Sequence, residues 1–280
     1  MTLRAVTCDS CGGAVAMEIG ADVPRCLFCG SLKLSQSEEL PEEVEPPEIV
    51  VAFSVSDEDA DAAFRKFARS SFWYPKDIRD ARLELNRLYL PAWVFSGTIE
   101  THYAAIVRAA TRSGGRPFAG AERTEMTGVL VPSSAALTRA ELDTISPFEM
   151  KDANPFSVST LEDPFELGSL TRTAATQQAL KHMQSRHRSA LSATLKARKL
   201  NASAIHEDLS GDPVLLPIFI GAYRRREEVY RIVINGQTGK LIGKAPISWT
   251  KVAVVIFIVG AILVMALLCL GLTGAIASQL

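Results

Sequence analysis

Apolar positions along the chain recur in two periods, and the longer period predicts three helices. Helical spacing runs over residues 56–71, with Ser56 placed as the N-cap, and again over residues 170–199. A shorter helix is expected near residues 134–145, with Ser133 or Ser134 as its cap. These segments supply the helical part of a folded body.

The shorter period, alternation of apolar and polar residues, predicts the strands. β-branched and aromatic residues are frequent over 88–108 and 122–131, and a third β-rich block covers 213–244, with turn residues at Asn235-Gly236. The segment LPAWVF at residues 90–95 resembles LPIFI at 216–220. The body is therefore predicted to be α+β, with two related β-units beside helices.

A long apolar run closes the chain. From Val252 to Leu272 there is neither a charge nor a proline, and as a helix this run would be roughly 32 Å long, enough to cross a bilayer. We therefore predict a single transmembrane helix over 250–276 and a short tail over 277–280. Between Val229 and Lys251 the charged residues are all positive (Arg231, Lys240, Lys244 and Lys251). The positive-inside rule then gives a tail-anchored protein of the inner membrane, with its N-terminal part in the cytoplasm.

Composition and charge divide the rest of the chain. The formal net charge is −1 and apolar residues make up 48%, which excludes a disordered chain and a strongly basic nucleic-acid binder. An acidic stretch with three prolines over 34–48 is typical of an exposed linker. The predicted units are thus a zinc ribbon over 1–33, this linker, and a body over 49–249.

Four cysteines near the N-terminus form two CxxC pairs, Cys8 with Cys11 and Cys26 with Cys29. No secretory signal precedes them, so disulfides are not favoured. Paired CxxC motifs at this spacing are typical of a structural Zn²⁺ site with four thiolate ligands. Such a short unit needs the metal to fold, and we expect its loss to leave the body intact. A redox CxxC pair is the alternative, without the βαβ pattern that usually surrounds one.

These motifs together resemble a family of bacterial membrane proteins with a TFIIB-type zinc ribbon. The resemblance rests on the two CxxC pairs, on YLPAWVF, and on NGQTGK at residues 235–240, placed before an apolar tail. It covers most of the chain and implies a zinc ribbon on a membrane protein. Some members of this family are linked to phage-shock-type stress proteins.

Catalytic motifs are missing from the sequence. There is no HExxH, no nucleophile elbow, no dinucleotide fingerprint and no phosphate loop. His182 and His187 are spaced so that they fall on different faces of a helix. We therefore expect a protein that is not an enzyme.

The leading hypothesis is a membrane-tethered adaptor or scaffold that recruits a protein partner to the cytoplasmic face, with the bilayer as its other partner. One alternative is a zinc ribbon that contacts nucleic acid, which the few cations of the ribbon (Arg4, Arg25 and Lys33) disfavour. Another is a non-catalytic subunit of a larger membrane complex. The sequence leaves the oligomeric state open.

Overall fold

The computed structural model describes residues 3–19, 24–37, 45–79, 83, 85–108, 115–135, 137–161, 163–225 and 228–277, with the side chains of the last helix described as far as residue 265. Much of the predicted linker, residues 38–44, lies outside the described part, as do residues 278–280 of the predicted tail.

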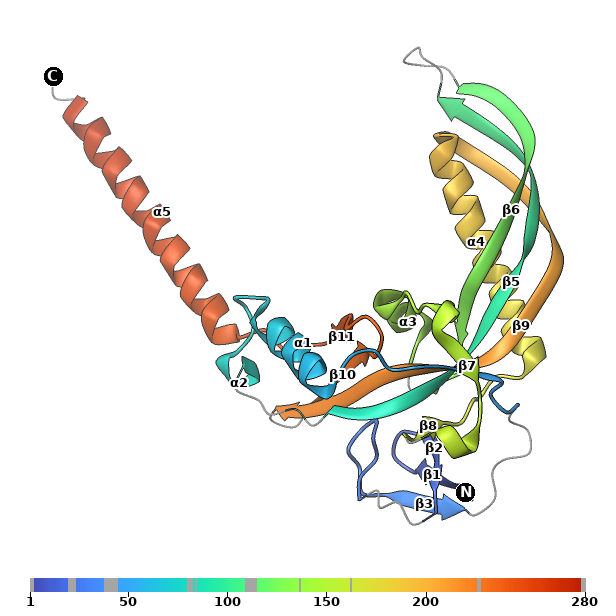
Figure 1. Cartoon of the computed structure of the whole chain (residues 1–280). Helices are drawn as coiled ribbons and strands as arrows, with labels where there is room; N and C mark the ends of the chain where they lie inside the picture. The colour runs from blue at the N-terminus through green and yellow to red at the C-terminus, as the bar shows by residue number, and fades with distance from the viewer. Residues whose placement is uncertain are drawn as a thin grey trace.

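One mixed sheet dominates the described part of the chain (Figure 1). Its main path runs β11-β10-β9-β5-β8-β2-β1-β3, with β6 paired to β5, and β4 paired to β7 and β9. The strands are β1 Leu3–Cys8, β2 Ala14–Glu18, β3 Leu34–Ser37, β4 Ile49–Val51, β5 Leu85–Arg108, β6 Gly115–Pro132, β7 Ala153–Pro155, β8 Phe165–Glu166, β9 Ala197–Arg225, β10 Glu228–Asn235 and β11 Leu241–Gly243. Since the N-terminal strands join the sheet through the β2–β8 pair, the predicted separation into a ribbon and an α+β body is corrected to one continuous mixed sheet.

Three long strands, β6, β5 and β9, form a curved arm (Figure 1). The register of β5 against β6 shifts between Phe95 and Gly97, and its register against β9 shifts between Ser96 and Thr98. Register shifts of this kind bend strands and increase their twist. The arm therefore curves, and helix α4 lies along the inner side of the curve.

Five α-helices accompany the sheet in the described residues. They are α1 Asp57–Arg69, α2 Lys76–Arg79, α3 Arg139–Ile145, α4 Arg172–Thr194 and α5 Trp249–Ala277. Ser56 caps α1 as predicted, by accepting a hydrogen bond from the N–H of Asp59. Helix α3 begins later than predicted because Thr138, with Glu141, forms a capping box. Ser133 is buried instead, at the end of β6.

The chain between α4 and the last hairpin also differs from the prediction. Helix α4 ends at Thr194, Lys196 has a positive φ of 49°, and strand β9 starts at Ala197, so the predicted helical residues 195–199 are wrong. The two similar segments are not two β-units either. They are neighbouring strands of one sheet, with Leu90 opposite Leu216 and Pro91 opposite Leu215.

The C-terminal helix α5 leaves the body near α1 and α2 (Figure 1). Across the described residues, no helix meets the length and apolarity needed to cross a membrane. This finding contradicts the predicted transmembrane helix over residues 250–276 and, with it, the predicted inner-membrane location.

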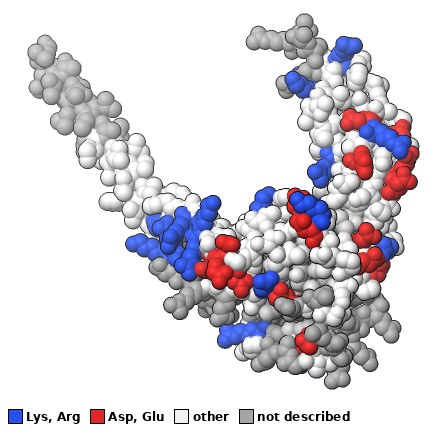
Figure 2. Space-filling model, in the orientation of Figure 1, with Lys and Arg blue, Asp and Glu red and all other residues white. Residues whose placement is uncertain are grey.

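Hydrogen bonds fix the first turn of α5 to the loop after α1. The Lys251 ammonium donates to the carbonyls of Phe72 and Tyr74, at 2.7 Å each, and the N–H of Ser248 donates to Trp73 O at 2.8 Å. Lys and Arg side chains gather at this junction (Figure 2). Burial, with help from the nearby charges of Arg79 and other cations, lowers the pKa of Lys251.

Candidate metal centre

Two loops of nearly identical backbone geometry carry the four cysteines. In the first knuckle, residues 8–13, the N–H of Gly12 donates to Cys8 O at 2.8 Å, and the N–H of Cys8 donates to Gly13 O at 2.9 Å. In the second knuckle, residues 26–31, Gly30 and Cys26 repeat this pattern at 2.9 and 2.8 Å. Gly12 and Gly30 both have a φ near +70°, which explains why glycine follows each CxxC pair.

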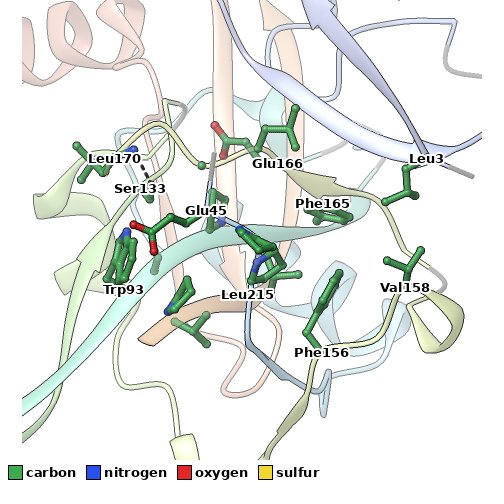
Figure 3. A pocket seen from close by; sticks show the side chains of 18 residues that line it. Leu3, Glu45, Trp93, Ser133, Phe156, Val158, Phe165, Glu166, Leu170 and Leu215 are labelled. Atoms are coloured by element: carbon green, nitrogen blue, oxygen red, sulfur yellow. Dashed lines mark hydrogen bonds between the residues drawn. The ribbon is translucent and has the colours of Figure 1, made fainter. Parts of the chain in front are cut away.

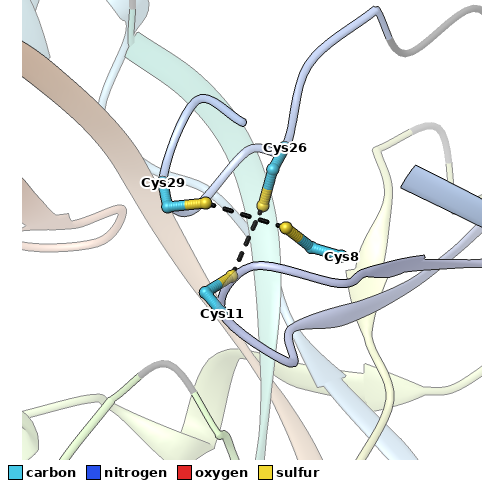
Figure 4. Close-up of side chains that lie close together, drawn as sticks. All are labelled: Cys8, Cys11, Cys26 and Cys29. Atoms are coloured by element: carbon cyan, nitrogen blue, oxygen red, sulfur yellow. Dashed lines mark hydrogen bonds between the residues drawn. The ribbon is translucent and has the colours of Figure 1, made fainter. Parts of the chain in front are cut away.

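The knuckles bring all four sulfurs together (Figure 4). The Sγ atoms of Cys8 and Cys29 are 3.7 Å apart, as are those of Cys11 and Cys26, and all four atoms lie within 4.8 Å of one another. Four sulfurs at ~2.3 Å from a tetrahedral ion would be roughly 3.8 Å apart. The predicted ligand residues are therefore close enough together to hold a metal ion.

The thiols differ in their electrostatic surroundings. Burial raises the pKa of Cys11 and of Cys26. Burial acts on Cys8 in the same direction, but hydrogen bonds from the backbone N–H groups of Ser10 and Cys11 outweigh it and lower the pKa of Cys8 to about 7. A cation at the centre would favour the thiolate form of every ligand, so binding releases protons and weakens as the pH falls.

Hydrogen bonds between the knuckles hold them in register. The hydroxyls of Ser10 and Ser31 are 2.8 Å apart, and the N–H of Asp9 donates to Lys33 O at 3.1 Å. The Ser35 hydroxyl donates to the Asp9 carboxylate at 2.9 Å. The geometry of each loop thus depends on the other, as expected when one ion binds both.

The metal centre packs on the core of the body. Cys8, Cys26 and Phe28 are buried in the same apolar cluster as Leu88 of β5 and Leu216 of β9. Phe28 also lies directly against Gly13, where an added Cβ would come within 2.5 Å of its ring. These contacts connect the knuckles to the longest strands. We therefore no longer expect the body to be independent of the metal, and loss of the ion should also destabilise the central sheet.

An apolar cavity of about 200 Å³ lies where the N-terminal strands meet the body (Figure 3). Leu3, Phe156 and Phe165 surround one end, and Trp93 and Glu45 lie at the other. The walls come from β1, the end of the predicted linker, the arm and the loops around β8. Its shape therefore depends on the position of the N-terminal strands.

The end of the predicted linker closes one side of this cavity. Arg172, the first residue of α4, pairs with the carboxylates of Glu45 and Glu48 at 3.0 and 3.3 Å, and its guanidinium lies 4.7 Å from the ring centre of Trp93. It also donates to Gly211 O at 2.6 Å. These contacts connect residues 45–48 to the body, although Pro46 and Glu48 themselves remain exposed, as predicted for the linker.

Two polar residues beside the cavity have roles that the sequence did not predict, and one of them, Ser133, was expected only as a possible helix cap. Ser133 Oγ accepts hydrogen bonds from the N–H groups of Leu170 and Ser169, at 2.9 and 3.1 Å. Glu166 is buried, and its carboxylate accepts from the Ser134 hydroxyl and from the N–H of Ala135. No short motif marks either residue, because their partners are distant in the sequence.

The four histidines each have separate surroundings. His102 lies 3.1 Å from the Glu100 carboxylate, and His206 lies 2.8 Å from the Gln184 amide. Burial lowers the pKa of both His206 and His182. His187 lies on the buried face of α4. In the described part of the chain, the cysteines are the one cluster of metal-ligating side chains that the structure assembles.

Comparison with known proteins adds one distant relative. No protein-family model matches the chain, and no solved structure matches it significantly. Over 224 residues the chain is 23% identical to a protein of Bacillus subtilis (strain 168) described as "Uncharacterized protein YdjG". The alignment covers 74% of this chain and 66%, just under two thirds, of that protein. At this identity the likeness does not assign the chain to a family.

Proposed function

We propose that the four cysteines hold a structural zinc ion and that the loops ordered by this ion bind a protein partner, which makes the chain a zinc-stabilised adaptor. Four thiolates fill the coordination sphere of zinc and leave no open position for a substrate. A structural role is supported by the burial of Cys8 and Cys26 and by the packing of Phe28 on the core.

Exposed apolar side chains near the knuckles carry the proposal of a protein partner. Leu32, directly after the second knuckle, is 71% exposed, and Ile19 at the end of β2 is 48% exposed. Burial of exposed leucine and isoleucine side chains against a partner contributes favourably to the free energy of binding. The position of Leu32 depends on the metal, because its neighbours Ser31 and Lys33 are hydrogen-bonded to the first knuckle.

Metal content is the first measurement. We expect one zinc ion per wild-type chain by elemental analysis, and less than one for Cys11→Ser. Replacement of zinc by Co²⁺ should give the absorption of a tetrahedral cobalt–thiolate site. Unchanged zinc content in Cys11→Ser would show that the four cysteines are not the site.

Partner capture is the second measurement. The full chain is immobilised and the bound proteins are quantified by mass spectrometry for wild type, Leu32→Ser, Cys11→Ser and the control Ile205→Ser, which removes an exposed apolar side chain from the arm. A partner of the knuckles is recovered with wild type and Ile205→Ser and lost with the other two variants, while Leu32→Ser keeps its zinc. Equal recovery from all four proteins would refute a recruiting role.

Nucleic acid is the competing ligand for a zinc ribbon. In the N-terminal strands the Arg4 guanidinium is engaged with the Gln36 side chain at 2.6 Å, and an acidic residue, Asp9, lies within the first knuckle. We therefore expect no mobility shift of nucleic acid by the full chain at low salt. A mobility shift with a steep salt dependence would indicate that the ligand of these loops is a nucleic acid and not a protein.

A further inference from the structure

The apolar packing between α4 and the arm is interrupted halfway along the helix. Met183 and Leu191 belong to two separate apolar clusters on the buried face of α4. Between them on the same face is His187, which is buried. Its Nε2 atom is buried and has no hydrogen-bond partner in the described part of the structure.

Strand β5 has a matching interruption on its side of the interface. Ile99 and Ala105 belong to the same two clusters as the α4 residues, and Thr101 lies between them on the same face of the strand. Thr101 is 2% exposed, and its hydroxyl finds no hydrogen-bond partner among the described residues. A buried hydroxyl without a partner costs ~1–3 kcal/mol, so a polar group that reaches Thr101 would offset a cost already present in the fold.

A groove of about 500 Å³ opens from Thr101 to the surface between α4 and β9. One stripe of α4 forms its helical wall, and Ala202–Ala204 of β9 form the other. The helical wall consists of Lys181, Gln184, Ser185 and Arg188. These positions follow the i, i+3, i+4, i+7 spacing, which places all four side chains along one side of the helix.

The polar groups of this groove are suited to an anion. Lys181 and Arg188 supply two positive charges, while no acidic residue is among the described residues that line it. Glu122, opposite Thr101 on β6, is exposed and lies outside the lining. Arg188 keeps further donors available while one of its N–H groups donates to Leu200 O at 2.9 Å.

We propose that this groove binds a phosphate group, either free or as the monoester of a small organic molecule. The Thr101 hydroxyl is closed to solvent in the structure, so it would rotate toward the groove to donate to a phosphate oxygen, and the remaining oxygens would face Lys181 and Arg188. Only a small group can reach a side chain as deeply buried as Thr101. The site is separate from the metal centre and does not depend on the proposed adaptor role.

Calorimetric titration of the full chain with inorganic phosphate and with glycerol phosphate tests the proposal, with sodium chloride at equal ionic strength as the control. We expect both phosphates to bind and chloride to give no heat. Tighter binding of the ester identifies an organic phosphate as the ligand, and equal affinities identify the free ion. Absence of binding by both phosphates overturns the proposal.

Three variants distinguish specific binding in this groove from general attraction of the anion by the positive charge of α4. Lys181→Gln should weaken phosphate binding about tenfold, because it removes one charge-assisted contact. Arg186→Gln removes the same charge from an exposed position of α4 outside the groove and should bind phosphate as wild type does. Equal weakening by both substitutions would show that the general charge of the helix, and not this groove, attracts the anion.

Thr101→Val gives the sharpest result because its two effects have opposite signs. Without phosphate the variant should unfold at a higher temperature than wild type, since it removes an unpaired buried hydroxyl while keeping the shape of the side chain. Its affinity for phosphate should fall by a factor similar to that of Lys181→Gln. Wild-type affinity in Thr101→Val would overturn the proposed contact.

Discussion

Asn235 connects the turn after β10 to the end of α3, and its replacement should destabilise the chain strongly. Its side chain is 0% exposed. The Nδ2 atom donates to Ile145 O at 2.8 Å and Pro147 O at 2.9 Å, while Oδ1 accepts from the N–H groups of Gln237 and Thr238 at 2.7 and 3.0 Å. Every hydrogen-bonding position of the amide is therefore used.

The magnitude follows from how deeply each bond is buried. Asn235→Ala leaves four backbone groups without this partner. The bond to Ile145 O is fully buried and the other three are partly buried, so the first should cost ~1–3 kcal/mol and each of the others ~0.5–1 kcal/mol. We expect a total loss of about 2.5–6 kcal/mol in the free energy of unfolding.

Asn235→Asp keeps the shape and both accepted bonds but places a carboxylate against two carbonyl oxygens. The protonated carboxyl can donate to one of them, so the pKa of this Asp should be raised by folding. A group whose pKa is raised by folding stabilises the folded state at a pH below its unfolded-state pKa, and this stabilisation is lost as the pH rises through the folded-state pKa. Asn235→Asp should therefore be closer to wild type at pH 4 than at pH 7.

Urea unfolding followed by circular dichroism at both pH values measures these differences, with Gln237→Ala as the control on the same turn. That side chain makes two exposed bonds to the backbone of Glu149, so its removal should cost less than about 1 kcal/mol. The reasoning fails if Asn235→Ala also costs less than 1 kcal/mol, or if the deficit of Asn235→Asp is the same at both pH values.

Two further predictions concern the helix ends near the arm. Ser133→Ala leaves the N–H of Leu170 without its acceptor, while the N–H of Ser169 keeps its bond to Ser133 O. Thermal unfolding should therefore show a loss of ~1–3 kcal/mol in stability, and Ser133→Thr, which keeps the hydroxyl, should lose less. Burial raises the pKa of Glu141, but hydrogen bonds from Thr138 and the guanidinium of Arg231 outweigh it and lower the pKa. A lowered pKa stabilises the folded state at a pH above the unfolded-state pKa, and this stabilisation is lost as the pH falls. Glu141→Gln should therefore be less stable than wild type at pH 7 and approach wild type below about pH 4. A stability difference that stays constant across this pH range would refute the assignment.

Local patterns in the sequence predict most of the secondary structure and little of its arrangement. Helical periodicity with Ser56 as a cap locates α1, and alternation locates β5 and the β10–β11 hairpin, because these preferences arise within one segment. The sheet itself is a set of pairings between distant segments. The likeness of residues 90–95 to 216–220 was interpreted as two units, although the same apolar pattern arises when two central strands of one sheet are buried side by side.

The two binding sites differ in the same way. The metal ligands could be predicted because each CxxC pair places two sulfurs on one tight loop. Each motif therefore supplies two of the four ligands within a few residues of sequence. The groove depends on Thr101, a single hydroxyl within a strand whose alternating pattern gives it no distinction, and on a stripe of α4 whose cations resemble any solvated helix face. Only the packing of the helix on the strand buries that hydroxyl without a partner among the described residues. The missing partner is a property of the fold and not of the residue, and it is this observation that indicates a ligand.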